Sequence, residues 1–425
     1  MPAADVAWLH MDRRTNLMVV NMVVSFGGMV DWESVKKLCR ERLVERYPRF
    51  SRRVVESRLP SGPVAWEDDS YFDLERHFHR LALREPGDQA ALLELVADLM
   101  ATPLDRSRPL WDMYLVEGYG VGCAIIARVH HCIGDGIALS RVMLSLTDDA
   151  PDGGVAPAHP SANASVPTRS DREQLGDLIR GARTFTQALV RPPVAGSDAG
   201  TVLKGRLGVA QRVATTRPVG LAAVKRTAHA ADATVNDVML GVVTGALSSY
   251  LRERGSRVDE IHVSVPINLR PLSEPIPREM GNRFGLGLLT LPLGLGDPHQ
   301  RLAEIHDRMV KIKHSPEGAV SYGTLRIAGM MPLTVERAFT DANTATASAV
   351  ITNVTGPPHP VYLAGTPVRE ILAWAPKPGS LSMCAMIFSY NGEISVSLAV
   401  DAGLIPDPER ILARVEDELQ EQLDA

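Results

Sequence analysis

The first 150 residues alternate between helix-like and strand-like hydrophobic patterns. Apolar positions recur every three or four residues in two segments, which predicts helices over 34–46 and 89–100. Short apolar runs rich in β-branched residues predict strands over 17–26, 111–117 and 122–130. The third of these runs breaks at Gly134-Asp135-Gly136 and is followed by a helical pattern over 137–146, so a strand, a polar turn and a helix are expected in succession.

The second half of the chain repeats this alternation. Thr234-Val-Asn-Asp237 is a typical N-terminal cap for the strongly apolar helix expected over 238–251. The sequence Tyr390-Asn391-Gly392-Glu393 between two apolar runs predicts a hairpin, because Asn-Gly tolerates the positive φ angles of a type I′ turn. Further strands are expected over 260–266 and 284–293 and near 350–353, 368–374, 382–390 and 394–401, with helices over 299–313 and 408–423.

Between the two halves the composition changes abruptly. From Asp148 to about Ser170 the chain is dominated by Asp, Pro, Gly, Ala and Ser, which cannot bury enough apolar surface to pack and is typical of a linker. A helix is possible over 172–190. We therefore predict an N-terminal domain over 1–150, a linker over 151–200 and a C-terminal domain over 201–425, giving an α/β protein of two domains.

Composition narrows the classes of partner. The chain has 425 residues, of which 45% are apolar and 22% charged, as in ordinary globular proteins. Its net charge of −5 offers no general attraction for nucleic acid. Lys and Arg are nonetheless enriched over 180–230, which fits either a solvated face or attraction to CoA phosphates or an anionic membrane surface.

Compartment and membrane topology can also be anticipated. The four cysteines lie far apart in sequence and predict buried free thiols in a reducing cytosol. The first residues carry an early acid and no basic region before an apolar stretch, so no secretory signal is expected. The longest uncharged stretch, 342–368, is interrupted by Asn and Pro, so no transmembrane helix is expected.

The densest group of reactive side chains is His130-His131-Cys132-Ile133-Gly134-Asp135-Gly136, at the expected end of a buried strand. Neutral imidazole is suited to proton abstraction near pH 7, and an Asp four residues after His131 can return to fix the turn. This pattern favours a general base held by a structural carboxylate. Metal binding is the less favoured reading because adjacent residues on a strand point to opposite faces. A Cys132 nucleophile and a purely structural histidine pair remain open, whereas no serine shows the Gly-x-Ser-x-Gly pattern of a hydrolase elbow.

The His130-His131-x-x-x-Asp135-Gly136 motif resembles the active-site motif of the bacterial wax ester synthase/acyl-CoA:diacylglycerol acyltransferase family. That family lies within the superfamily of CoA-dependent acyltransferases that includes chloramphenicol acetyltransferase and peptide-synthetase condensation domains. Other blocks resemble the family in the expected order, so the resemblance covers almost the whole chain: 9–26, 72–77, Pro109-Leu110-Trp111, Thr234-Val-Asn236-Asp237, Val265-Pro-Ile-Asn268-Leu-Arg270, Gly281-Asn282-Arg283, Asn353-Val-Thr-Gly356-Pro357, 389–392 and 404–407. Thr355 and Cys132 depart from the residues common in the family, proline and alanine.

The resemblance implies two similar mixed α/β domains, as in chloramphenicol acetyltransferase, which meet along a tunnel with the His motif at its centre. It implies a long-chain acyl-CoA donor and, as acceptor, diacylglycerol or a long-chain alcohol. His131 would be the general base, Asp135 would hold the turn, and His130 is the weaker catalytic candidate. The remaining matched positions are expected in substrate binding or structural support: Gly136, Pro109, Leu110, Trp111, Asn236, Asp237, Asn268, Arg270 and Asn353. Asn268 or Asn236 could also donate a hydrogen bond to the oxyanion.

The expected enzyme needs no metal and no cofactor, with acyl-CoA as co-substrate. We expect a cytoplasmic protein that associates peripherally with membranes or lipid droplets. Two alternatives share the same motif: a condensation-type acyltransferase that takes its acyl group from a carrier protein, and a catalytically silent lipid-binding relative.

Overall fold

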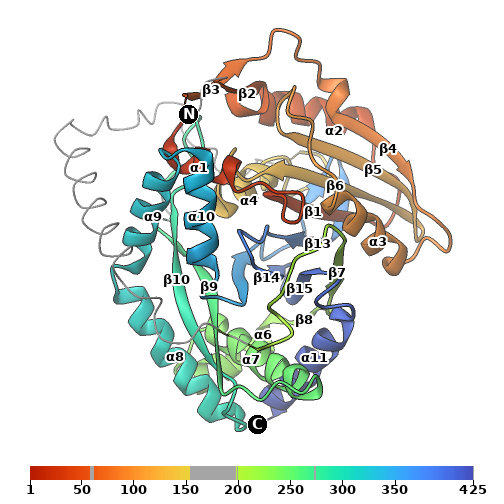
Figure 1. Cartoon of the computed structure of the whole chain (residues 1–425). Helices are drawn as coiled ribbons and strands as arrows, with labels where there is room; N and C mark the ends of the chain where they lie inside the picture. The colour runs from red at the N-terminus through yellow and green to blue at the C-terminus, as the bar shows by residue number, and fades with distance from the viewer. Residues whose placement is uncertain (58–61, 154–197, 199, 272–273, 425) are drawn as a thin grey trace.

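The computed structural model describes residues 1–57, 62–153, 198, 200–271 and 274–424, which form two mixed sheets and the helices around them (Figure 1). The first sheet has six strands in the order β12-β13-β1-β6-β5-β4. Its strands are β1 (Val19–Phe26), β4 (Phe78–Ala82), β5 (Trp111–Tyr119), β6 (Gly122–His130), β12 (Tyr362–Leu363) and β13 (Thr366–Trp374), and a separate ribbon pairs β2 (Arg52–Glu56) with β3 (Val64–Asp68).

The second sheet runs in the order β10-β9-β11-β14-β15-β7, and β8 pairs with β15. Tyr390 pairs with Glu393 across the turn between β14 and β15, and Asn391 and Gly392 have φ angles of 50° and 76°. The hairpin predicted from Asn-Gly is therefore confirmed. The strands are β7 (Gln211–Thr215), β8 (Val219–Gly220), β9 (Glu260–Asn268), β10 (Phe284–Pro292), β11 (Ala349–Thr355), β14 (Met383–Tyr390) and β15 (Glu393–Asp401).

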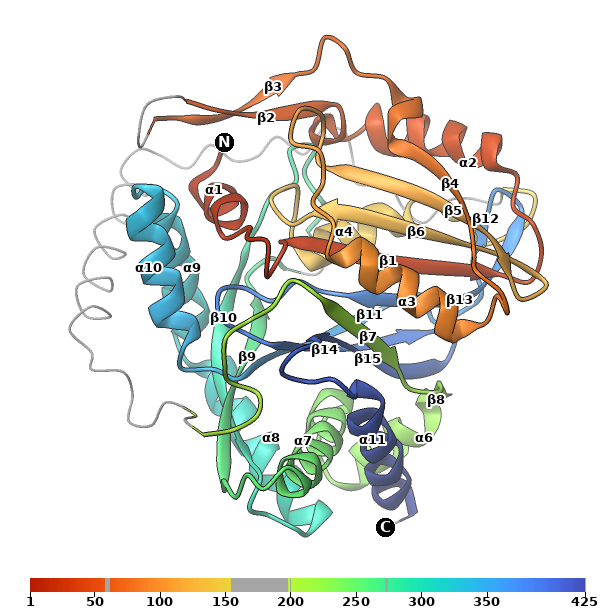
Figure 2. The same cartoon turned by 45° about the vertical axis from the view of Figure 1, so that its right-hand side comes forward.

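Helices pack against both sheets (Figure 2). The first core lies among α1 (Ala3–His10), α2 (Trp32–Cys39), α4 (Gly136–Leu144) and their sheet. The second core lies under α6 (Leu221–Ala230), α7 (Val235–Glu253), α8 (Pro298–His314) and α11 (Pro408–Asp424). A third cluster places α3 (Gln89–Met100) against both sheets. The remaining helical elements are the π-helix Arg40–Val44, the 3₁₀ helices Pro48–Phe50 and Leu74–His77, α9 (Glu317–Ala328) and α10 (Leu333–Thr344).

The sequence predicts the fold class correctly: the protein is α/β with two sheet-rich halves. The helix expected over 34–46 is divided, because α2 ends at Cys39 and continues as a π-helix to Val44. One arrangement was not anticipated. Strand β13 belongs to the C-terminal half in sequence but pairs antiparallel with β1 in the first sheet, so the two halves are interlocked.

The division at 150 and 201 stays a prediction. The linker expected over 151–200 and its possible helix over 172–190 lie almost entirely outside the described residues.

Candidate active site

The turn between β6 and α4 holds the histidine motif. Strand β6 ends at His130, and α4 begins at Gly136 with Asp135 as its N-cap. Asp135 Oδ1 accepts a hydrogen bond from the amide of Ala138 at 2.8 Å. The carboxylate thus caps the N-terminus of α4 at the end of the turn.

A segment of the second half docks on this turn. Gly281 donates its amide to the carbonyl of Ile133 at 3.3 Å, and the amide of Arg283 donates to Asp135 Oδ2 at 3.0 Å. Gly281 has a φ of +98°, and an added Cβ would lie 3.3 Å from Arg49 Nη2, so both conformation and space favour glycine. Arg270 adds an ion pair, with Nη2 3.6 Å from Asp135 Oδ2.

Asn282, the next residue, contacts the side chain of His131. Its Oδ1 lies 2.9 Å from His131 Nδ1, while its Nδ2 donates to Asp5 Oδ1 at 2.8 Å and to the carbonyl of His131 at 2.9 Å. Both partners of Nδ2 are acceptors, which fixes the orientation of the amide. Because Oδ1 is an acceptor, His131 Nδ1 must carry a proton. The neutral ring therefore has an unprotonated Nε2, which can accept a proton.

Asp5 and Arg49 form a buried ion pair behind Asn282. Arg49 Nη1 donates to Asp5 Oδ2 at 2.8 Å, and the same nitrogen lies 3.0 Å from the carbonyl of Cys132 and 3.1 Å from that of Ile133. The side chains of Arg49 and Asp5 are 3% and 1% exposed. The pair therefore joins α1, the motif turn and Asn282 into one hydrogen-bonded unit.

Aromatic rings enclose His131. Trp8 stacks on it with ring centroids 4.1 Å apart, and Phe284 lies 5.6 Å away on centroids. Burial is the main influence and lowers the pKa of His131 to about 4. The charge of Asp135 and the hydrogen bond of Asn282 raise this pKa, but by less than burial lowers it. The imidazole is neutral at pH 7.

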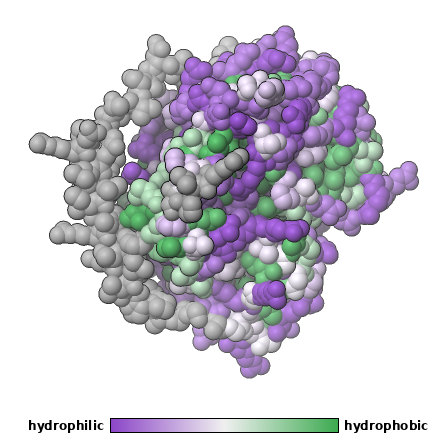
Figure 3. All heavy atoms as spheres, turned by 45° about the horizontal axis from the view of Figure 1, so that its top comes forward, coloured by the Kyte–Doolittle hydropathy of each residue, from purple (hydrophilic) through white to green (hydrophobic). Residues whose placement is uncertain are grey.

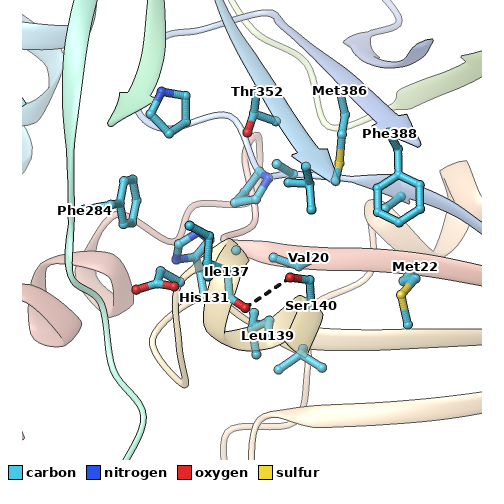
Figure 4. A pocket seen from close by; sticks show the side chains of 18 of the residues that line it. Val20, Met22, His131, Ile137, Leu139, Ser140, Phe284, Thr352, Met386 and Phe388 are labelled. Carbon is cyan, nitrogen blue, oxygen red and sulfur yellow. Dashed lines mark hydrogen bonds between the residues drawn. The ribbon is translucent and has the colours of Figure 1, made fainter. Parts of the chain in front are cut away.

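His131 faces an apolar cavity of about 210 Å³ between the two sheets (Figure 4). Val20 and Met22 project into it from the first sheet, and Thr352, Met386 and Phe388 from the second. One face of α4 along its whole length, Trp8 of α1 and parts of β9 and β10 also line it. The motif thus lies where the two halves meet, next to space suited to hydrocarbon.

Several predicted site residues line this cavity and others lie behind it. Asp135, Gly136, Asn268 and Asn353 are among the lining residues. Asn268 is bound within its own turn: Nδ2 donates to the carbonyl of Arg270 at 2.6 Å, and Oδ1 accepts from its amide at 3.0 Å. Asn353 Nδ2 donates to Asn236 Oδ1 at 3.2 Å, which places Asn236 one contact away from the cavity.

The other matched positions support the scaffold. Leu110 and Trp111 are both 1% exposed, and Trp111 Nε1 donates to the carbonyl of Phe50 at 2.8 Å while its ring stacks on His77. Pro109 precedes them at the start of β5. Asp237 forms a capping box with Thr234 at the start of α7 and contacts His306 Nδ1 at 2.9 Å.

The surroundings of His130 do not fit a metal site shared with His131, and those of Cys132 do not fit a nucleophile. His130 Nδ1 accepts the amide of Cys132 at 3.1 Å, and its Nε2 lies 3.8 Å from Asp12, whereas His131 Nδ1 is held by Asn282. The two rings do not converge on one point. Cys132 is fully buried, and burial raises the pKa of its thiol well above the usual value, so no thiolate forms near pH 7.

Part of the basic stretch can be located. Lys204 Nζ donates to the carbonyl of Ala345 at 2.7 Å, Arg212 pairs with Glu409, and Arg217 pairs with Glu416. These three side chains form hydrogen bonds or ion pairs with other residues of the chain. The positions from 180 to 197 lie outside the described residues.

The residues around His131 that sequence reasoning missed are Asp5, Trp8 and Arg49. Asn282 belongs to a block that resembles the family, but no role was assigned to it. A charged residue in an apolar N-terminal helix was the available signal at Asp5, where the helix Ala3–His10 is otherwise largely hydrophobic.

The fold and the site define a class of two-domain acyltransferase-like proteins. The structure aligns with the wax ester synthase/diacylglycerol acyltransferase from Marinobacter aquaeolei VT8 at a TM-score of 0.70 and 24% identity, covering 98% of this chain and 97% of that one. It also aligns with the first condensation domain of the CDA synthetase at a TM-score of 0.63 and 16% identity, covering 99% and 95% of the two chains. At these identities the likeness establishes the fold.

Sequence comparison identifies the family. The wax ester synthase/diacylglycerol acyltransferase catalytic domain matches residues 1–239, and the WS/DGAT C-terminal domain matches residues 280–422. A Mycobacterium tuberculosis protein named as a probable diacylglycerol O-acyltransferase, tgs1, is 28% identical over 425 aligned positions, covering 96% of this chain and 91% of the relative; a Mycobacterium bovis protein gives the same values. The chain belongs to the wax ester synthase/diacylglycerol acyltransferase family and is an acyltransferase.

Proposed function

We propose that this protein transfers a long-chain acyl group from acyl-CoA to the hydroxyl of diacylglycerol or of a long-chain alcohol, with His131 as the general base. The observation that carries the proposal is the hydrogen bond from His131 Nδ1 to Asn282 Oδ1, which leaves Nε2 unprotonated beside an apolar cavity. The names of the mycobacterial relatives and the family match support diacylglycerol as an acceptor.

The proposed reaction needs one proton shuttle. The acceptor oxygen attacks the thioester carbonyl carbon while its proton moves to His131 Nε2. The tetrahedral intermediate then breaks its C–S bond, and the imidazolium returns the proton to the departing CoA thiolate. The products are an ester and free CoA, so atoms and charge balance without a metal or a resident cofactor. Because the buried imidazolium is disfavoured, it exists only transiently and the base is restored after each turnover.

The cavity lining suits substrates with hydrocarbon chains. Besides His131 and Asp135, most lining residues are aliphatic, aromatic or methionine, and they come from both halves of the chain. An apolar enclosure around the base also excludes water, which would otherwise compete with the acceptor hydroxyl and hydrolyse the thioester.

The experiment that tests this proposal supplies the purified chain with palmitoyl-CoA and either dioleoylglycerol or hexadecanol, then separates the lipid products. We expect triacylglycerol or wax ester in amounts equal to the CoA released. Product formation only with a carrier-protein-bound acyl group would support the condensation-type alternative. Release of CoA that does not depend on the acceptor would contradict acyl transfer to a lipid alcohol.

We also propose that the protein binds lipid surfaces peripherally from the cytoplasm. Within the described residues, no helix is long and apolar enough to cross a membrane. Figure 3 shows a largely hydrophilic face with hydrophobic residues in patches. At and after the turn joining α9 to α10, Met330, Leu333 and Val335 are 55%, 37% and 51% exposed, which supports insertion of this tip among lipids.

The tip offers a direct test of lipid binding. Replacing Met330 and Val335 together by Ser should reduce co-flotation with dioleoylphosphatidylcholine vesicles that contain dioleoylglycerol. Replacing the exposed Val121 by Ser, on the turn between β5 and β6, is the matched control and should leave flotation unchanged. Equal flotation of both variants would contradict a lipid-binding role for the α9–α10 tip.

A further inference from the structure

A second, smaller void adjoins the apolar cavity at His131, in the core of the N-terminal half. This void, of about 40 Å³, lies between α4, α2 and the face of the first sheet. Five residues line both spaces, so the two adjoin: Met22, Ala127, Met143, Leu144 and Ile371. The residues that line only the inner void are Val24, Val35, Met113, Ile125, Leu146, Thr147 and Leu363.

Strand register places short side chains at the boundary between the two spaces. Met22 pairs with Ala373 on one side and with Ala127 on the other, and Ala127 pairs in turn with Met113. The row across the sheet is therefore Ala373–Met22–Ala127–Met113. Paired positions point to the same face of a sheet, so the short side chain of Ala127 leaves space between the two methionines.

The path runs along this face from the catalytic motif toward α2. Val20 and Val129 form the row nearest His131, and Val24 and Ile125 form the row that borders the inner void. Val24 lies four positions after Val20, which corresponds to about 13 Å along a strand. Met113, in the row of Met22 and Ala127, lines the inner void, and its Sδ lies 3.6 Å from the Sγ of Cys39 on α2.

The chemistry of the inner void fits hydrocarbon. Its lining is apolar except for Thr147, whose Oγ1 donates to the carbonyl of Leu144 at 2.8 Å. Protein cores normally close such spaces, and apolar cavities stay dry and accept apolar ligands. The three methionines around it, Met22, Met113 and Met143, have flexible side chains that can move aside for a guest.

We propose that the inner void is the closed end of a hydrocarbon-chain channel that starts at His131, and that Met113 and Ala127 set the length of chain it accepts. The inference rests on the proposed function and adds to it a binding site for the tail of one substrate. That tail could belong to the acyl donor or to the alcohol acceptor, and the chemistry of the site is the same for both.

Two variants change the channel in opposite directions. Met113→Ala enlarges its closed end, and Ala127→Leu fills the passage between the two spaces. Met309→Ala is the matched control, because Met309 is a methionine on α8 that is buried in the separate core of the second sheet. Each variant is first checked for cooperative thermal unfolding, and rates are expressed per folded molecule.

The assay measures kcat/KM in two arms. In the first arm, acyl-CoA length varies from 10 to about 20 carbons with hexadecanol held constant. In the second arm, the length of the alcohol varies with palmitoyl-CoA held constant. Met113→Ala should move the optimum of one arm to chains about two methylenes longer, with a gain of about fourfold in kcat/KM for each newly accommodated methylene. Ala127→Leu should move the same optimum to shorter chains, and Met309→Ala should leave both profiles in place.

The outcomes separate this inference from the proposed function. A shift in the acyl-CoA arm assigns the channel to the donor, and a shift in the alcohol arm assigns it to the acceptor. Wild-type activity with unchanged profiles in both Met113→Ala and Ala127→Leu would overturn the channel and leave the proposed reaction intact. A wild-type protein with no transfer in either arm would contradict the proposed reaction itself.

Discussion

Replacing Asn282 by alanine tests whether the tautomer of His131 is set by the second half of the chain. The substitution removes the acceptor of His131 Nδ1 and the two hydrogen bonds that Asn282 Nδ2 donates, to Asp5 and to the carbonyl of His131. The backbone amide of Asn282, which also donates to Asp5 Oδ1 at 2.9 Å, remains. The ring of His131 would then be free to exchange the proton between its nitrogens and to rotate.

The expected size of the effect follows from these contacts. A buried neutral hydrogen bond contributes about 0.5–1.5 kcal/mol, so loss of the Nδ1 contact alone accounts for up to about a tenfold fall in rate. Occupation of the wrong tautomer and rotamer of the His131 ring lowers the rate further. We therefore expect kcat to fall about 10- to 100-fold. The unpaired groups at Asp5 and His131 should also lower the free energy of unfolding by about 2–4 kcal/mol.

The assay compares acceptor-dependent CoA release with chemical unfolding of the same preparations. Asn21→Ala is the control: Asn21 is equally buried and bonded, with Nδ2 donating to the carbonyl of Val19 and Oδ1 accepting from Arg128, but it lies on the face of β1 opposite Val20 and Met22. The control should lose stability and keep its rate per folded molecule. Equal kcat in Asn282→Ala and wild type would refute the tautomer argument.

Two further predictions concern the charges at the motif. Asp135→Ala should lower the free energy of unfolding by about 3–5 kcal/mol, measured in urea, because it removes the α4 cap and leaves the buried Arg270 without its carboxylate; an unchanged value would contradict the structural role. The pH dependence should show kcat/KM constant from pH 6 upward and falling below about pH 5, because the pKa of His131 is about 4 in the folded free enzyme. The ordinary pKa of 6.5 applies to the unfolded chain, which binds the proton first, so stability is fully present above pH 6.5 and decreases by roughly 3 kcal/mol as the pH falls to 4. His131→Ala should lack this part of the acid destabilisation, and identical pH dependence of unfolding in the two proteins would refute the assigned pKa.

Local patterns predicted the elements that carry the motif. The apolar run of β6, the glycine-flanked turn and the cap at Asp135 are all encoded within about 25 residues, so their succession could be read directly. By contrast, α9 and α10 were not predicted. Only Gly318 and Ala328 are buried in α9, so this helix lacks the regular apolar stripe that marks a helix in sequence.

The long-range arrangement could not be predicted for a different reason. Asp5 and Asn282 are 277 positions apart, and Arg49 and Cys132 are 83 apart, so neither contact leaves a trace in a local window. The pairing of β13 with β1 likewise depends on tertiary packing, because the strand pattern over 368–374 does not specify which sheet it joins. The motif in the sequence indicated His131 as the candidate base, whereas the tautomer of its ring could be assigned only from the structure.

The central claim is that His131 Nε2 removes the proton of the acceptor hydroxyl. Its most direct test is CoA release from palmitoyl-CoA, with and without the preferred acceptor, in wild type and in His131→Ala. Loss of the general base should reduce the acceptor-dependent rate by about 10²–10⁴-fold while the variant still unfolds cooperatively. A folded His131→Ala protein that transfers acyl groups at the wild-type rate would contradict the account.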